Sequence, residues 1–241
     1  MRTAGYLRVD LDQMRGGEAR KSCDDPLMLV AGVDACRGGW IAVVLDADHF
    51  ADSISSPTFV ELLGSGPDAR VVGVDIPIGL PSEGARAADV AARVFVGPRR
   101  SSVFPTPPRA ALVATTYAEA RGVLPSLSAQ SFALGKKILE VEACLEERVI
   151  EVHPEVSFAA LAGQPLRHSK RSWNGQMERR RLLASTGIEL PDELTAGQAA
   201  ADDVLDAAIA AWTAARKDRG EAATLPADPP VQDGRPVAIW Y

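Results

Sequence analysis

Short apolar runs that stop at polar, glycine or proline residues fill the chain between residues 27 and 76. The runs at 27–34 and 40–45 are joined by only five residues, too few for a crossover helix, so they predict an antiparallel pair of strands. Three more elements are expected here: a weaker strand at 50–54, a short helix at 57–63 with proline in its first turn, and a buried strand at 71–76. This order favours a mixed sheet over a purely parallel one.

Helical patterns dominate the rest of the chain. An irregular loop is expected at 97–108, because three prolines fall within four positions there. A short strand at 149–152 is expected to lie beside the first strand. The other expected elements are helices at 84–96, from a Ser128 cap to about 147, at 155–161, at 176–185 and at 200–216, and a terminal strand at 237–240.

The composition is that of an ordinary globular chain. Its 241 residues are 46% hydrophobic and 24% charged, which allows a proper core and excludes repeat arrays and disordered proteins. The longest apolar run, 27–33, is far shorter than the roughly 20 residues of a membrane-spanning helix, so no membrane association is expected. Three cysteines without C-x-x-C spacing indicate neither a zinc site nor a disulfide framework, and a cytoplasmic location is expected.

The N-terminal segment differs in character from the rest of the chain. Its first 25 residues hold five basic and five acidic side chains, with no apolar segment typical of a signal peptide. We expect a mobile tail at 1–26 and a single domain over 27–241, with a helical insertion at about 84–147. One hypothesis is that the natural protein begins at Met28; detection of earlier residues by mass spectrometry of the native protein would disprove it.

Charge is distributed unevenly along the chain. The 32 acidic and 26 basic residues leave a net charge of −6, which argues against an unselective nucleic-acid coating protein but not against a carboxylate site that holds cations. Two basic segments, 97–109 and 167–181, interrupt this acidic chain. Such side chains either contact substrate phosphates or form a solvated surface. The candidates for phosphate contacts are Arg99, Arg100, Lys170 and Arg171.

Aspartates occupy positions that hydrophobic burial would disfavour. Asp34 ends the first apolar strand and Asp75 lies near the end of a later one, where a carboxylate needs a cation or strong donors to offset its desolvation. Asp203 and Asp206 are three residues apart in the last long helix, so both side chains lie on one face. The alternatives are turn caps for the strand aspartates, a helix-dipole interaction for Asp202 and Asp203, and a cap for Asp202.

Several segments together resemble one family. They are G-V-D-A-C-R-G-G-W (32–40), V-D-I-P-I-G-L-P (74–81), R-R-S-S-V-F-P-T-P-P-R (99–109), E-V-H-P-E-V-S-F (151–158) and D-D-V-L-D-A (202–207). The chain resembles, over about residues 28–241, the prokaryotic family named domain of unknown function 429 (DUF429), described as predicted ribonuclease H-like nucleases of the resolvase-like branch. The resemblance implies an α/β ribonuclease H-like mixed sheet with N-terminal antiparallel hairpin strands, flanking helices and a helical insertion.

The resemblance also implies a metal-dependent site. Phosphodiester cleavage of this kind uses two divalent ions about 4 Å apart, one activating water and one stabilising the leaving oxygen. Carboxylate oxygens suit such hard cations, and Mg²⁺ or Mn²⁺ is the implied cofactor. The implied ligands are Asp34 bridging both ions, Asp75 on one ion, and Asp203 or Asp206 on the other.

Further side chains are candidates for the same site. His153 and Glu155 form a family-like H-P-E turn, in which the proline would hold both side chains toward the site. His153 is a candidate proton shuttle, and a histidine satisfied by local hydrogen bonds is the alternative. Glu151 would share a strand face with His153 as an extra ligand, and Glu61 on the predicted 57–63 helix holds a place comparable to a glutamate of ribonuclease H.

The expected function is that of a divalent-metal-dependent nuclease. Its partner would be nucleic acid of unknown type, and a homodimer is one arrangement, because resolvase-like relatives often work as dimers. A P-loop, a G-x-S-x-G motif and an H-E-x-x-H motif are absent. Two other classes stay open: a non-catalytic module that binds nucleic acid or protein on the same fold, and a phosphohydrolase or phosphotransferase for a small substrate.

Overall fold

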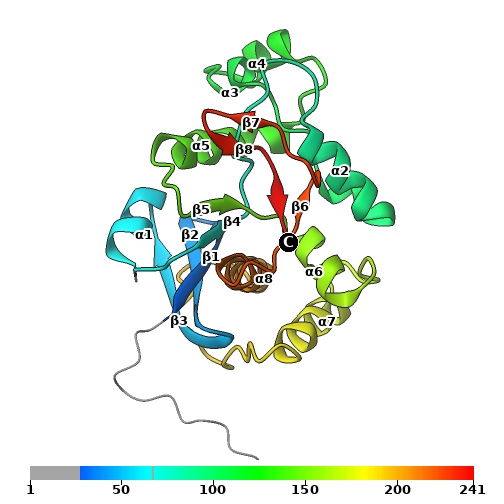
Figure 1. Cartoon of the computed structure of the whole chain (residues 1–241). Coiled ribbons are helices and arrows are strands. Elements are labelled where there is room, and N and C mark those ends of the chain that lie inside the picture. The colour runs from blue at the N-terminus through cyan, green and yellow to red at the C-terminus, as the bar shows by residue number, and fades with distance from the viewer. Residues whose placement is uncertain (1–27, 67) are drawn as a thin grey trace, which may run out of the picture.

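The computed structural model describes residues 28–66 and 68–241, so the tail expected at 1–26 lies outside the described residues. Its main sheet has the strand order β3-β2-β1-β4-β5 (Figure 1). β2 pairs antiparallel with β1 and β3, whereas β4 runs parallel to β1 and β5 parallel to β4. This mixed α/β sheet confirms the predicted fold class. The strands are β1 (Leu29–Cys36), β2 (Gly39–Asp46), β3 (His49–Ser56), β4 (Val72–Val74) and β5 (Val149–Glu151).

Helices cover both faces of this sheet (Figure 1). On one face, α1 (Phe59–Ser65) and α5 (Ala129–Ala143) pack against Val33 and Val74. The core on the other face, which includes Val30, is closed by α6 (Pro154–Ala162), α7 (Trp173–Ala184) and α8 (Ala201–Asp218). Among the described residues, no helix has both the length and the apolar character needed to cross a membrane.

Two glycines let α8 lie directly on the sheet. A Cβ added to Gly32 of β1 would lie 2.0 Å from the backbone nitrogen of Ala211, and one added to Gly73 of β4 would lie 2.7 Å from the carbonyl oxygen of Ala210. Larger residues at these positions would therefore push the helix away. The helix with the D-x-x-D pair thus packs closely against the strand that contains Asp34.

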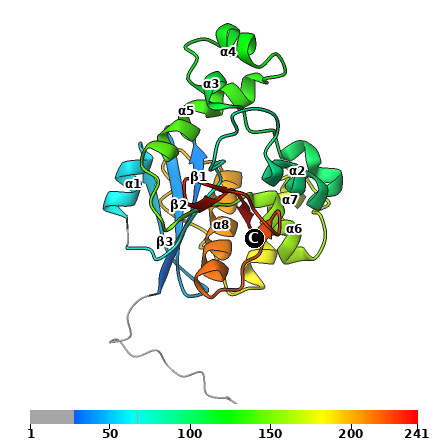
Figure 2. The same ribbon diagram turned by 45° about the horizontal axis from the view of Figure 1, so that its top comes forward.

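The connection between β4 and β5 is largely helical. It contains α2 (Ala87–Phe95), the 3₁₀ helix η2 (Gly97–Ser102), α3 (Arg109–Leu112) and α4 (Tyr117–Val123), followed by α5. α3 and α4 form a small apolar cluster with the start of α5 and stand apart from the main sheet (Figure 2). The C-terminal residues pair as β6 (Thr224–Leu225) with β9 (Ile239–Trp240), and as β7 (Val231–Gln232) with β8 (Arg235–Pro236).

Three local predictions are wrong, each for a local reason. The segment 97–102 is a 3₁₀ helix rather than a loop, because Pro98 stands in its first turn, where a missing N–H costs nothing. β5 lies beside β4 and not beside β1, whose two edges are already paired with β2 and β4. Pro57 precedes α1 rather than joining its first turn, since the side chain of Thr58 caps the helix by accepting from the backbone nitrogen of Glu61.

Candidate metal centre and its cleft

Three carboxylates meet where β1, β4 and α8 come together. Asp34 lies in β1, Asp75 directly follows β4, and Asp206 lies inside α8. One oxygen from each carboxylate lies within 4.8 Å of the oxygens of the other two. Asp34 is only 7% exposed and Asp206 only 1%. The three side chains, called the carboxylate group below, can hold one metal ion between them.

The topology of the sheet explains why two of these aspartates meet. β1 and β4 are parallel neighbours, so their carboxyl ends reach the same edge of the sheet. The backbone nitrogen of Asp75 donates to the carbonyl oxygen of Val33 at 2.9 Å, which extends the pairing to the residue before Asp34. The third carboxylate arrives from α8, which the glycines of β1 and β4 allow to approach closely.

Asp203 does not join the carboxylate group. Its Oδ2 accepts from the backbone nitrogen of Ala200 at 2.9 Å, so it caps the start of α8. Asp202 does not cap the helix, because Ala200 is the N-cap residue; its carboxylate lies in the first turn, where a negative charge suits the helix dipole, and 3.9 Å from the Nε of Arg171. Asp203 still acts on the group at a distance: burial is the main cause that raises the pKa of Asp34, and the charge of Asp203 adds to the increase.

The negative charges of the carboxylate group repel one another. Burial, followed by the charges of Asp75 and Asp206, raises the pKa of Asp34 well above its ordinary value. Burial also raises the pKa of Asp75 to about 6 and that of Asp206 to about 7. Carboxylates that have lost hydration and repel one another gain strongly from a cation. The donor set therefore fits a hard divalent cation, although the identity of the metal does not follow from it.

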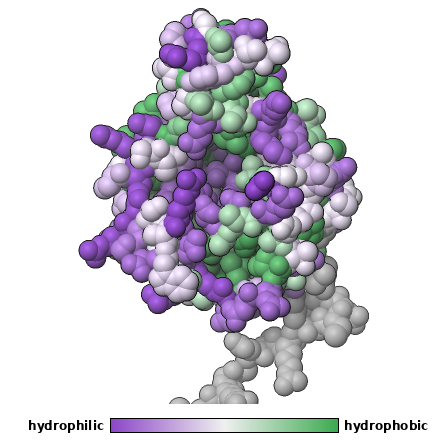
Figure 3. Space-filling view, turned by 180° about the vertical axis from the view of Figure 1, so that it is seen from behind, coloured by the Kyte–Doolittle hydropathy of each residue, from purple (hydrophilic) through white to green (hydrophobic). Residues whose placement is uncertain are grey.

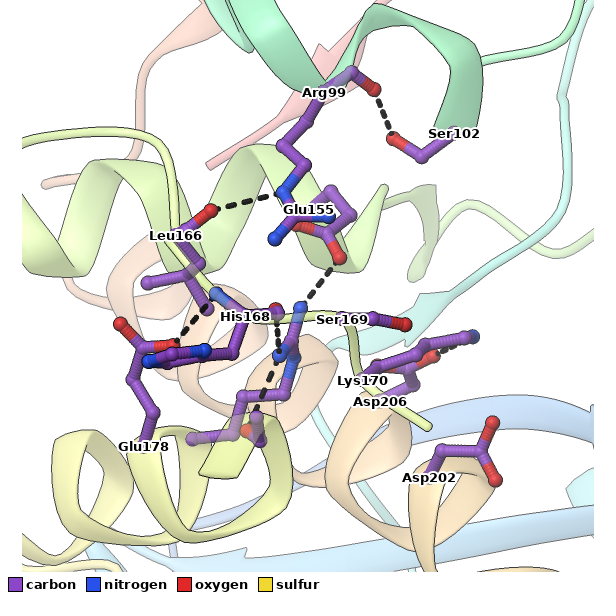
Figure 4. Close-up of polar contacts among 12 residues, drawn as sticks. Arg99, Ser102, Glu155, Leu166, His168, Ser169, Lys170, Glu178, Asp202 and Asp206 are labelled. Carbon is purple, nitrogen blue, oxygen red and sulfur yellow. Dashed lines mark hydrogen bonds and ion pairs between the residues drawn. The ribbon is translucent and has the colours of Figure 1, made fainter. Parts of the chain in front are cut away.

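Lys170 reaches the same group from the loop before α7 (Figure 4). Its Nζ donates to Oδ2 of Asp206. Burial alone would lower the pKa of Lys170, but the charges of Asp206, Asp75 and Asp34 outweigh it and raise this pKa. The ammonium therefore stays protonated. The sequence suggested Lys170 as a phosphate contact, and here it contacts a carboxylate.

The H-P-E turn borders the same cleft. Glu155 accepts at Oε1 from Nη2 of the fully buried Arg179 at 2.5 Å, while its Oε2 is buried with no hydrogen-bond partner among the described residues. His153 Nε2 lies 3.4 Å from the carbonyl oxygen of Ser102, and its Nδ1 is likewise buried and unpartnered in the described chain. Burial lowers the pKa of His153, so the ring is neutral at pH 7.

Two other suggested ligands lie outside the carboxylate group. Glu151 is buried in β5, but Arg86 donates to its Oε1 at 2.7 Å and to its Oε2 at 2.8 Å. The backbone nitrogen of Ile78 adds a third bond to Oε2 at 2.7 Å. Glu151 is therefore part of a buried ion network and not of the metal centre. Glu61 is exposed on α1 and does not line the cleft.

A cleft of about 580 Å³ opens over the carboxylate group. Seen from behind, the surface is hollowed near its centre, with hydrophilic side chains around the hollow (Figure 3). Arg100 is exposed and does not line the cleft. The basic and polar side chains along its walls include Arg99, Lys170, Arg171, Ser102, His153 and Glu155.

The ion-pair roles of two buried arginines were not predicted from the sequence. Arg86 and Arg179 are 5% and 0% exposed, and each bonds to a glutamate beside the cleft. For Arg86 a signal was present, because Asp89 lies three residues later among the small and apolar residues at the start of α2. For Arg179 no local signal was present, since it begins a run of three arginines that is typical of a solvated surface.

Comparison with known families places this chain in a family. A family model described as "Protein of unknown function (DUF429)" matches residues 32–231. Searches with the chain matched no curated protein and no solved structure. The matched range contains the whole carboxylate group, the H-P-E turn and Lys170.

Proposed function

The chain belongs to the DUF429 family, and we propose that it is a divalent-metal-dependent nuclease that hydrolyses phosphodiester bonds at the carboxylate group. The observation that supports this most strongly is the buried group of Asp34, Asp75 and Asp206 at one edge of a ribonuclease H-like sheet, beneath a polar cleft. Mg²⁺ or Mn²⁺ is the proposed cofactor, because both take carboxylate oxygens. In this proposal residues 27–241 form one domain, with the helices at about 84–147 as an insertion.

The protein groups around the cleft have distinct proposed roles. The three aspartates would hold the cation, which when bound supplies a Lewis acid for water and phosphate oxygens. Glu155 lines the cleft and would accept a proton from the attacking water, while Arg179 on its Oε1 holds the carboxylate in place. Neutral His153 also lines the cleft and would exchange a proton with substrate or water.

The test is cleavage of a labelled panel of single strands, duplexes, RNA–DNA hybrids and junctions, with Mg²⁺, Mn²⁺ or chelator. We expect metal-dependent cleavage of at least one substrate, reduced roughly a hundredfold or more in Asp206→Asn, which removes a proposed ligand. Asp202→Asn is the matched control, because Asp202 lies in the same helix but outside the carboxylate group. Cleavage in chelator, or equal rates for Asp206→Asn and the control, would contradict the proposal.

A phosphohydrolase or phosphotransferase for a small substrate is the second candidate. The cleft volume of about 580 Å³ favours it, since sites for small ligands commonly measure roughly 300–1,000 Å³. Including nucleotides and bis(p-nitrophenyl) phosphate in the panel separates the two activities. Cleavage of these compounds but of no polymer would favour the second candidate, and binding of nucleic acid without any cleavage would favour a non-catalytic module.

A further inference from the structure

Lys170 is a member of the carboxylate group rather than a surface cation. Its side chain is 35% exposed, but it ends on Asp206, whose side chain is 2% exposed. The negative charges of Asp75 and Asp34 also act on this ammonium. A flexible lysine on a loose loop would leave readily for solvent, so the position of the ammonium depends on how firmly its backbone is held.

The loop that carries Lys170 is tied to η2 on one side (Figure 4). Nε of Arg99 donates to the carbonyl oxygen of Leu166 at 2.9 Å, and Nη2 donates to that of Arg167 at 2.6 Å. Two bonds from one planar guanidinium to successive carbonyls fix both the distance and the direction of the loop. Arg99, suggested by the sequence as a phosphate contact, therefore anchors the loop of the lysine.

The same loop is tied to α7 on its other side. The carbonyl oxygen of His168 accepts from Nη1 of the buried Arg179 at 3.3 Å. The next carbonyl, that of Ser169, accepts from the hydroxyl of Ser172 at 2.7 Å. It also packs so closely on α7 that a Cβ added to Gly175 would lie 1.9 Å from it. The backbone just before the lysine is thus fixed by the protein itself.

The charges of this arrangement match one divalent cation better than two. Three ionised carboxylates and one ammonium carry a net charge of about −2, which a single divalent ion neutralises. A second divalent ion would leave a buried excess of positive charge and would compete with the ammonium for the oxygens of Asp206.

We propose that Lys170 takes the place of a second metal ion, so that the site binds one divalent cation and the ammonium supplies the other positive charge facing the substrate phosphate. This proposal rests on the proposed function, because it divides the work of a two-ion centre between an ion and a side chain. The bonds that fix the loop to η2 and to α7 would then hold a positive charge beside the carboxylates, where a metal ion would otherwise be required.

The experiment measures how many Mn²⁺ ions the full chain binds, by calorimetric titration and by electron paramagnetic resonance. Lys170→Met removes the charge and keeps the length of the side chain, whereas Lys170→Arg keeps the charge. Arg171→Met is the matched control, since it removes a neighbouring cation whose side chain is 83% exposed and 3.9 Å from Asp202. Thermal unfolding in chelator identifies any variant that is not folded.

We expect one Mn²⁺ per chain for wild type, Lys170→Arg and Arg171→Met, and two for Lys170→Met, with the spin coupling of neighbouring ions. Two ions in the wild type, or a single ion in folded Lys170→Met, would overturn the proposal. Its failure is distinguishable from that of the proposed function. The expected ion counts without any cleavage would reject the nuclease alone, and metal-dependent cleavage by a wild type that binds two ions would reject the role of Lys170 alone.

Discussion

An Arg86→Met substitution would leave two buried carboxylates without their cation. Arg86 uses all five N–H groups of its guanidinium. Nε and Nη2 donate to Oδ1 of Asp89 at 3.1 and 2.5 Å, respectively. Nη2 also donates to Oε1 of Glu151 at 2.7 Å, and Nη1 donates to Oε2 of Glu151 at 2.8 Å and to the carbonyl oxygen of Ile78 at 2.9 Å. The exposed fractions of the three charged side chains are 3%, 3% and 5%. Water therefore has little access to replace the lost bonds.

The expected cost follows from the burial of this network. Removing one partner of a buried ion pair costs about 3–5 kcal/mol, because the remaining charge is left without compensation. Burial already raises the pKa of Glu151 despite the presence of Arg86, so the carboxyl would take up a proton more readily once the arginine is gone. With about 2–4 °C per kcal/mol for a chain of this size, the midpoint of thermal unfolding should fall by roughly 6–20 °C.

The assay is thermal and denaturant-induced unfolding in chelator at neutral pH, with Arg109→Met as the control. Arg109 pairs with Glu142, but the two side chains are 59% and 28% exposed, so its loss should cost less than about 1 kcal/mol. If Arg86→Met were as stable as Arg109→Met, the reasoning about buried charge would be refuted.

Three further predictions concern the carboxylate group and the helix above it. Asp34→Asn should lose tight Mn²⁺ binding in calorimetry, yet be at least as stable as wild type in chelator, because one of three repelling buried charges is removed; unchanged affinity would contradict this. Gly32→Ala should lower the free energy of unfolding in denaturant by more than about 2 kcal/mol, since its Cβ would lie 2.0 Å from the backbone of α8. Gly64→Ala is the control and should not lower it, because nothing lies within 4 Å of its Cβ. Burial raises the pKa of Asp75 to about 6 and that of Asp206 to about 7 in the folded protein. The stability that these groups contribute to the metal-free protein is therefore fully present below the unfolded pKa of roughly 4 and is lost as the pH rises through 6 and 7. In chelator, Asp206→Asn should therefore gain stability relative to wild type between about pH 5 and pH 8, and a constant difference would argue against the shift.

Local patterns in the sequence determined much of the secondary structure. The five residues between the first two apolar runs leave room only for a hairpin, and β1 and β2 form one. Ser128 predicts the start of α5 because a serine hydroxyl accepts from an unpaired N–H of the first turn, as it does here from the nitrogen of Ser131 at 3.0 Å. The family-like segments also indicated that Asp34 and Asp75 belong with Asp203 or Asp206, and the structure brings oxygens of Asp34, Asp75 and Asp206 within 4.8 Å of one another.

Only the tertiary structure decided which charged side chains pair with one another. Spacing along α8 made Asp203 and Asp206 equal candidates, but one caps the helix and the other faces β1. Glu151 and Lys170 both differ from what was expected of them: the glutamate, a suggested metal ligand, pairs with an arginine, and the lysine, a suggested phosphate contact, joins the carboxylates. Local periodicity encodes which face of an element is buried, whereas the partner of a buried charge depends on segments that are distant in the chain and meet only when the core packs.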